Sequence, residues 1–235
     1  MTDGPVRVGL LVPSSNTVME VDFHRHLPPD RFTVHTGRMY LEETTPEAES
    51  EMLDHHVMPA ARDVATVRPH VLVFGCTSAG ALRGNRADEA LCAAMAGATG
   101  TEVISTIRSV REAMERRGAR RVAVVTPYVD ALNDKIRSSI EADGVEVAVI
   151  RGLGITENFR IATVSPEEIA RMAQETVGSL ASPPDLVFAS CTNLRAVDAL
   201  EARARAGGVP AISSNQAVLE AVLLRHGLSW PSVAA

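Results

Sequence analysis

The sequence has few aromatic residues and no excess of positive charge. Phe, Trp and Tyr together make up 3% of the 235 residues, and the formal net charge is −6. Proteins that bind single-stranded nucleic acid stack its bases on aromatic side chains, and nucleic-acid binding in general requires a basic surface. We therefore expect no nucleic-acid partner.

Long hydrophobic runs and abundant cysteine are also missing. No stretch approaches the roughly 20 apolar residues of a membrane-spanning helix, and segment 1–7 lacks the basic start and apolar core of a signal peptide. The three cysteines are an odd count, which favours a reducing compartment over a disulfide framework. These absences predict a cytoplasmic protein that has no membrane partner.

Two similar segments stand out in an otherwise ordinary globular composition of 46% hydrophobic and 22% charged residues. Segments 71–78 and 186–193 are each a short apolar run that breaks into small polar residues. Such runs are typical of strands buried on both faces. Each segment has a cysteine at the break, and these residues, Cys76 and Cys191, are 115 positions apart.

Other matching positions keep nearly the same spacing. Pro13 and Pro127, each at the end of an apolar strand pattern, are 114 positions apart, and Ile104 and Ile212 are 108 apart. The chain is therefore interpreted as a duplication in which each half contributes one thiol. The predicted lobes are residues 1–107 together with 216–235, and residues 108–215.

Strand and helix patterns alternate along both halves. The helix starts carry familiar signals, such as the Thr-Pro pair at 45–46 and the Ser-Pro pair at 165–166. The strands are predicted at 7–12, 32–37, 71–76, 102–105, 122–126, 145–151, 186–190 and 211–213. The helices are predicted from 14–17 to about 28, and at 45–67, 88–96, 130–143, 166–180, 195–205 and 216–225.

This alternation predicts an α/β protein with two pseudo-symmetric, flavodoxin-like halves. Each half should be a four-stranded parallel sheet flanked by helices, with the active site between the halves. Ligands of such sheets bind at the carboxyl ends of the strands. Four candidate residues fall at that edge: Asn16, Cys76, Tyr128 and Cys191.

A thiol at the end of a strand and the start of a helix is a candidate nucleophile or base. Backbone N–H groups and the positive helix end there are expected to lower the pKa of the thiol. The plain alternative is that cysteine is a common buried residue, and Cys92, in an Ala-rich helical pattern, is assigned to the core. The duplication favours the functional interpretation of Cys76 and Cys191, and a disulfide between them conflicts with the compartment.

Other chemistries find little support in the sequence. The histidine pairs, His24 with His26 and His55 with His56, do not have the i,i+4 spacing of helical metal ligands. No Gly-x-Ser-x-Gly elbow occurs, and the glycines at 152–154 lack the third glycine of a dinucleotide loop. We expect neither a metal nor an organic cofactor.

Five short motifs follow one another along the chain: VPSSNT at 12–17, GCT at 75–77, VTPY at 125–128, EN at 157–158 and SC at 190–191. In order and spacing they resemble the aspartate/glutamate racemase superfamily. Within it, the chain looks most like the branch of maleate cis-trans isomerases and arylmalonate decarboxylases, over essentially its whole length.

The resemblance implies a covalent mechanism for a small dicarboxylate substrate. In maleate isomerases the cysteine that matches Cys76 adds as a thiolate to the cis double bond, and the one that matches Cys191 supplies and then removes a proton on the neighbouring carbon. Rotation about the saturated bond and elimination of the thiolate then release the trans product.

The resemblance also implies which residues hold the substrate carboxylates. Asn16, Tyr128 and Asn158 match such residues, although Asn16 also suits a helix N-cap and Asn158 a turn. Hydroxyl groups beside the cysteines either bind a carboxylate or enediolate oxygen or cap the following helices. The further binding candidates are Thr77, Ser78, Thr192 and Ser14.

One departure keeps alternatives open. Segment 76–80 (CTSAG) is more polar than expected for a maleate isomerase and resembles racemase and ectoine-utilisation relatives. The main expectation is a cofactor-independent cis–trans isomerase; a two-cysteine racemase of an amino acid or related carboxylate is the alternative. Further alternatives are a decarboxylase, against which Cys76 argues, and a non-catalytic anion-binding protein.

Residues 42–50 and 80–88 are lid candidates, and a homodimer is a candidate assembly.

Overall fold

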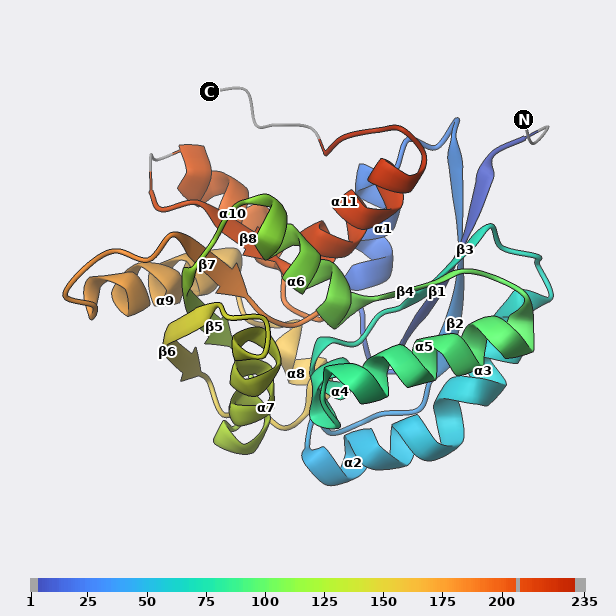
Figure 1. Cartoon of the computed structure of the whole chain (residues 1–235), viewed down its shortest axis with the longest axis horizontal. Helices are drawn as coiled ribbons and strands as arrows, with labels where there is room; N and C mark the ends of the chain where they lie inside the picture. Colours follow the sequence, from blue (N-terminus) through green and yellow to red (C-terminus); the bar gives the residue numbers. More distant parts are fainter. Residues whose placement is uncertain (1–3, 206–207, 231–235) are drawn as a thin grey trace.

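The chain folds into two four-stranded parallel sheets, as a computed structural model shows for residues 4–205 and 208–230 (Figure 1). The strand orders, β2-β1-β3-β4 and β6-β5-β7-β8, repeat one topology, which confirms the predicted α/β fold with two similar halves. All the pairings within these sheets are parallel. The strands are β1 (Val6–Pro13), β2 (Phe32–Met39), β3 (Val71–Phe74), β4 (Val103–Ser105), β5 (Arg121–Thr126), β6 (Glu146–Gly152), β7 (Leu186–Ala189) and β8 (Ala211–Ser213).

Helices connect successive strands. Residues predicted to form one helix over 45–67 instead form α2, a π-helical turn η1 and α3 in sequence. The structure adds three helices to those predicted, α4, α6 and α8. The helices are α1 (Met19–His26), α2 (Pro46–Glu51), η1 (Met52–His56), α3 (Val57–Ala65), α4 (Thr77–Leu82), α5 (Asn85–Thr99), α6 (Thr106–Arg116), α7 (Asp130–Glu141), α8 (Asn158–Ile161), α9 (Pro166–Gly178), α10 (Ala196–Arg205) and α11 (Ser214–Arg225).

Helix α6 forms for reasons that its sequence contains. The Ser105 hydroxyl accepts a hydrogen bond from the N–H of Arg108, which caps the helix start. Ile107, Val110 and Met114 lie on one buried face, and the charged residues lie opposite. The helix therefore follows β4 directly and packs against α11.

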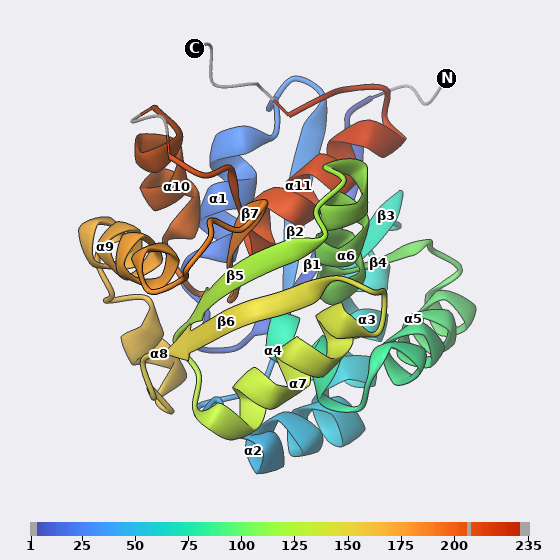
Figure 2. The same ribbon diagram turned by 60° about the vertical axis from the view of Figure 1, so that its left-hand side comes forward.

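The two sheets lie on opposite sides of the molecule, and α4, α6 and α8 lie between them (Figure 1). In the turned view β5 and β6 come forward, with α7 along β6 (Figure 2). Helix α3 packs on β1 and β2, and α9 packs on β5 and β7. No helix in the described ranges is long and apolar enough to cross a bilayer.

One hydrophobic cluster joins the halves. It includes Leu72 and Phe74 of the first sheet together with Val124 and Phe188 of the second. A second cluster joins the apolar face of α11 to β1, β3 and β4, so the last helix packs on the first sheet. The division into lobes 1–107 plus 216–235 and 108–215 stays a prediction, and residues 1–3 and 231–235 lie outside the described ranges.

The close approach of β3 to β1 makes glycine necessary at position 75. A Cβ atom there would lie 2.6 Å from the Leu11 carbonyl oxygen and 2.7 Å from Met19 Sδ. We expect Gly75→Ala to lower the free energy of unfolding by about 1–3 kcal/mol, measured by urea denaturation. The matched control is Gly97→Ala, on the exposed face of α5 with no atom near the new Cβ.

That control should be stabilising by about 0.5–1 kcal/mol, because alanine loses less backbone entropy than glycine in a helix. Equal effects of the two substitutions would contradict the packing described for Gly75.

Candidate active site

The two cysteines occupy equivalent places in the two sheets. Cys76 is the residue before α4, two positions after β3 ends, and Cys191 lies two positions after β7 ends. Both lie at the carboxyl ends of their strands, as predicted. Both are free thiols and are only 4% and 5% exposed, respectively.

Cys191 has an unusual backbone conformation. Its φ angle is +156°, a region that residues other than glycine rarely adopt. The backbone N–H of Cys191 donates to Ser214 Oγ at 3.1 Å, and its Sγ accepts from the N–H of Asn193 at 3.3 Å. The turn is therefore held from both sides with the sulfur inward.

The thiols share neighbours. Tyr128, 1% exposed, forms a hydrogen bond with Cys191 through its hydroxyl. Burial raises the pKa of Tyr128 well above its usual range, and the charges of Cys191, Cys76 and Glu49 raise it further. Cys191 also raises the pKa of Cys76. The structure thus brings together Cys76, Tyr128 and Cys191 and adds Glu49 to them.

The prediction that the thiol pKa values are lowered is wrong for this structure. Burial raises the pKa of Cys76 well above its usual range, and the charge of Glu49 adds to that effect, although the N–H of Ala79 lowers it in part. Burial likewise raises the pKa of Cys191 to about 11, against hydrogen bonds from Asn193 and Tyr128. The helix-start groups are present as expected, but loss of hydration outweighs them.

Hydrogen bonds join the two carboxyl edges beside the cysteines. Asn16 Nδ2 donates to Thr192 Oγ1 at 3.0 Å, and that hydroxyl donates to the Gly75 carbonyl at 3.1 Å. A third hydrogen bond joins the same edges: Thr77 Oγ1 donates to Ser214 Oγ at 2.9 Å. The hydroxyl and amide groups predicted to bind substrate therefore also hold the two halves together.

Asn16 has the helix-capping role that the sequence allowed, and its predicted role in holding a substrate carboxylate stays a prediction. Its Oδ1 accepts from the N–H groups of Val18 and Met19, both at 3.0 Å, so it caps the start of α1. Its Nδ2 reaches the second half at Thr192. A single buried side chain thus joins the start of α1 to the turn after β7.

Asn158 lies in a connection that crosses between the halves. Its N–H donates to the Glu42 carbonyl at 2.8 Å, its Nδ2 donates to Ser15 Oγ at 2.8 Å, and its Oδ1 accepts from Thr44 Oγ1 at 3.2 Å. The N–H of Thr44 donates to the Thr156 carbonyl at 2.6 Å. We call residues 42–44 together with 156–158 the strap; residues 42–44 fall within one of the two lid candidates.

Ser14 is the predicted site residue that the structure ties elsewhere. Its Oγ accepts from the N–H of Leu41 at 3.0 Å and donates to the carbonyl of the same residue at 3.4 Å. These hydrogen bonds of Ser14 thus fix the chain after β2 and do not reach a cysteine.

Sequence patterns do not indicate a role for three residues near the thiols: Glu49, Asn193 and Ser214. They mark Glu49 only as an early acid of the helix predicted at 45–67, yet its side chain is fully buried. Asn193 Nδ2 donates to the Asn158 carbonyl at 2.7 Å, which connects the Cys191 turn to the strap. The similarity of segments 71–78 and 186–193 could have pointed to Asn193, whereas nothing in the pattern marks Glu49 as buried.

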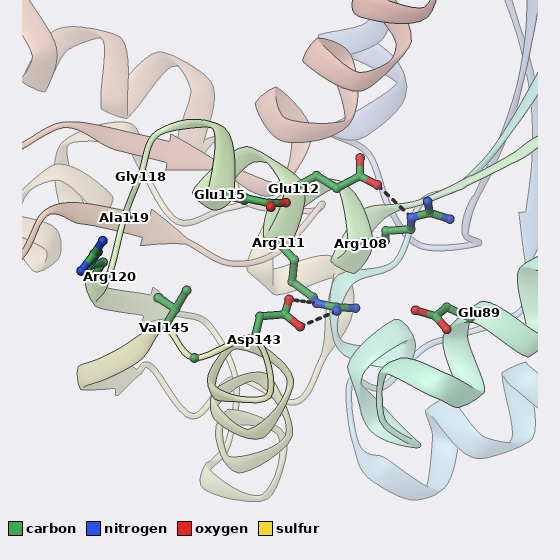
Figure 3. Close-up of a pocket in the computed structure, with 11 residues that line it drawn as sticks. Glu89, Arg108, Arg111, Glu112, Glu115, Gly118, Ala119, Arg120, Asp143 and Val145 are labelled. Carbon is green, nitrogen blue, oxygen red and sulfur yellow. Dashed lines mark hydrogen bonds and ion pairs between the residues drawn. The ribbon is translucent and has the colours of Figure 1, made fainter.

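A separate pocket of 1040 Å³ opens beside α6 (Figure 3). It lies near the amino ends of β5 and β6, the sheet edge opposite to the cysteines. Its Arg111 pairs with Asp143 and its Arg108 with Glu112, so these cations already have anionic partners. The pocket is therefore separate from the cysteines, and these two arginines are already engaged in ion pairs.

The chain is similar to two kinds of enzyme, maleate isomerases and an arylmalonate decarboxylase. It is 27% identical to the maleate isomerase of Nocardia farcinica over 92% of this chain and 88% of that protein. It is 29% identical to the arylmalonate decarboxylase of Bordetella bronchiseptica over 89% and 86% of the two chains.

Solved structures have the same fold. A mutant of the Nocardia farcinica maleate cis-trans isomerase with a covalently bound succinylcysteine intermediate superposes with a TM-score of 0.84 at 26% identity, over 96% of this chain and 94% of that one. The maleate isomerase of Pseudomonas putida S16, in a mutant form with maleate, gives 0.85 at 27% identity over 95% and 92%. The family model of arylmalonate decarboxylase matches residues 8–233. That match covers nearly the whole chain, in agreement with the motifs, and the protein belongs to the arylmalonate decarboxylase family.

Proposed function

We propose that this protein is a cofactor-independent cis–trans isomerase of a small dicarboxylate, converting a maleate-type substrate to its trans isomer. The observation that carries the proposal is the pair of free thiols, Cys76 and Cys191, at equivalent strand ends with Tyr128 and Glu49 as shared neighbours. The covalent succinylcysteine in a relative supports the same chemistry.

In the proposed mechanism Cys76 is the nucleophile. Its thiolate forms a carbon–sulfur bond to one carbon of the double bond, and the electron pair moves to the neighbouring carbon and its carboxylate. Cys191 gives its proton to that neighbouring carbon, so the central bond becomes single and rotates. Cys191 then takes a proton back, the double bond re-forms as trans, and the Cys76 thiolate leaves.

Polar groups around the thiols would hold the two carboxylates. Asn16, Thr192 and Thr77 present amide or hydroxyl groups at the joined sheet edges. The Tyr128 hydroxyl, kept protonated by burial, is a donor for a carboxylate or an enediolate oxygen. Asn158, which belongs to the strap, and Ser78 are further proposed carboxylate-binding residues. Ser14 is also in the proposed set, where it positions the loop at Leu41.

Substrate must enter a site whose thiols are almost completely buried. The strap spans the two halves next to Asn158, and residues 42–44 fall within a lid candidate, so we propose that it opens for entry and closes over the substrate. Closure would exclude water from the thiolate and from the carbanion that forms beside it.

The proposal is tested by proton NMR of maleate with the purified enzyme in heavy water. We expect the maleate signal to decrease and a fumarate signal to appear. Deuterium entering the α position of an amino acid, with no fumarate from maleate, would instead favour the two-cysteine racemase. Absence of both reactions, with ligand affinity unaffected by Cys76→Ser and Cys191→Ser, would favour a protein that only binds a small anion.

Thiol chemistry also bears on where the protein acts. Because both thiols must stay reduced, we propose a cytoplasmic location, in agreement with the three unpaired cysteines. A homodimer stays a prediction that sedimentation analysis can test.

A further inference from the structure

Glu49 is a buried carboxyl group with an unsatisfied oxygen beside the thiols. Its side chain is fully inaccessible, Oε1 accepts a hydrogen bond from Ser78 Oγ, and Oε2 has no hydrogen-bond partner within the described part of the chain. A buried carboxylate that lacks a full set of partners is costly, which suggests that it serves a purpose beyond folding.

Ser78 connects this carboxyl group to the nucleophile. Ser78 Oγ lies 4.0 Å from Cys76 Sγ and donates to Glu49 Oε1. Cys76 and Ser78 flank the start of α4, and Glu49 comes from α2, which packs against α4. The three side chains therefore form a continuous path from sulfur to hydroxyl to carboxylate.

We propose that Glu49 accepts the proton of Cys76 through Ser78 and so generates the thiolate that attacks the substrate. This assignment rests on the proposed function, in which Cys76 is the nucleophile. Glu49 is a positioning and proton-accepting residue in this scheme, because it acts on the reacting sulfur through Ser78.

The transfer is balanced within the three side chains. The S–H bond of Cys76 breaks as its proton passes to Ser78 Oγ, and the O–H bond of Ser78 breaks as its own proton passes to Glu49 Oε1. The products are a thiolate, an unchanged serine hydroxyl and a neutral carboxylic acid. When the thiolate leaves the product, the same path can return the proton to sulfur.

The surroundings explain why an internal acceptor is required. Burial raises the pKa of the Cys76 thiol well above its usual range, so few thiolates form spontaneously at neutral pH. Burial also raises the pKa of Glu49 to about 8, against the hydrogen bond from Ser78. The titratable groups that face Glu49 are Cys76 near α4, Tyr128 after β5 and Cys191 after β7. No ion pair to Glu49 occurs within residues 4–205 and 208–230.

The transfer places the negative charge on the reacting atom. Before it the charge lies on Glu49, and after it the charge lies on the Cys76 sulfur, so the net charge of the three side chains is unchanged. With Glu49 protonated, Ser78 Oγ can accept from the acid and direct its own hydrogen toward a substrate oxygen. Ser78 can therefore first pass the proton to Glu49 and then donate a hydrogen bond to the substrate with the same hydroxyl group.

The first measurement is the pH dependence of kcat with maleate for wild type, Glu49→Gln and Glu49→Asp. We expect wild-type kcat to rise with pH through about 8, because only an ionised Glu49 can accept a proton. Glu49→Gln should lower kcat by about 10²- to 10⁴-fold, with little change in KM, and remove that rise. Glu49→Asp keeps a carboxylate and should recover part of kcat together with the rise.

The second measurement is alkylation of Cys76 by iodoacetamide against pH, in a background with Cys92→Ser and Cys191→Ser. The charge of Glu49 raises the pKa of Cys76, so Glu49→Gln should move the alkylation midpoint to lower pH. If Glu49 is the proton acceptor, Glu49→Gln should have a lower kcat although its Cys76 thiol ionises more easily. If Glu49 acted only through its charge, kcat of Glu49→Gln would equal or exceed that of the wild type. If Glu49 had only a structural role, Glu49→Asp would not recover the pH profile.

Asp88→Asn is the matched control. Asp88 is also a buried acid with unsatisfied oxygens, but its charged neighbours are Arg111, Glu89 and Arg108. We expect its kcat profile and alkylation midpoint to match those of the wild type. Wild-type kcat retained in Glu49→Gln, or an unchanged midpoint, would overturn the proposal. A wild-type protein that leaves maleate unchanged would overturn the proposed function instead, and the alkylation midpoint would still test the coupling of Glu49 to Cys76.

Discussion

Replacing Cys76 with serine is expected to lower kcat for maleate isomerisation by at least about 10⁴-fold, because it removes the attacking atom. A serine hydroxyl ionises far less readily than a thiol, and burial at this position makes an anion still harder to form. A neutral hydroxyl does not add to the double bond of a dicarboxylate at a useful rate. The measurement is fumarate formation, followed by NMR or by the loss of maleate absorbance.

Cys92→Ser is the control for that variant. It makes the same atomic change in α5, where Cys92 is partly buried against the core and lies outside the thiol cluster. We expect its kcat to stay within a few-fold of wild type. A comparable loss in both variants would indicate general damage, and near-normal turnover by Cys76→Ser would refute the nucleophile assignment.

Replacing Cys191 with serine should also abolish turnover but leave the first step possible. Cys76 can still add to the double bond, and a proton can reach the neighbouring carbon slowly from elsewhere. Without a base at position 191 to remove that proton again, elimination stops. We therefore expect a stable adduct of one dicarboxylate per chain, seen by intact-protein mass spectrometry and mapped to Cys76.

The double variant with both Cys76→Ser and Cys191→Ser should form no adduct. An adduct that persists in it, or one that maps to Cys92, would show that the modification is unrelated to the proposed step. Fumarate production by Cys191→Ser at a rate near wild type would remove Cys191 from the mechanism.

Much of the fold follows from local patterns. Strands β3 and β7 are short apolar runs between polar segments, and their burial on both faces agrees with a central position in a parallel sheet. The duplication is visible because the segments around Cys76 and Cys191 have the same residue types. The sequence pattern does not indicate helix α6, because its arginines and glutamates obscure the apolar face of Ile107, Val110 and Met114.

Two features of the site depend on tertiary packing and were therefore beyond sequence patterns. The pKa of a thiol at a helix start depends on how much water reaches it, and closure of the halves over Cys76 and Cys191 reverses the expected direction. Glu49 belongs to a helix that begins with ordinary capping signals, Thr45 and Pro46, and only the packing of α2 on α4 directs its carboxyl group to Ser78. Residues that act from a neighbouring layer have no fixed spacing from the residue they serve.

The most direct test of the account is a crystal structure of Cys191→Ser after reaction with maleate. It should show a covalent bond from Cys76 Sγ to one carbon of the dicarboxylate, with position 191 facing the neighbouring carbon from the opposite side and Glu49 still in contact with Ser78. A dicarboxylate bound away from both positions, or both positions on the same face of it, would contradict the account.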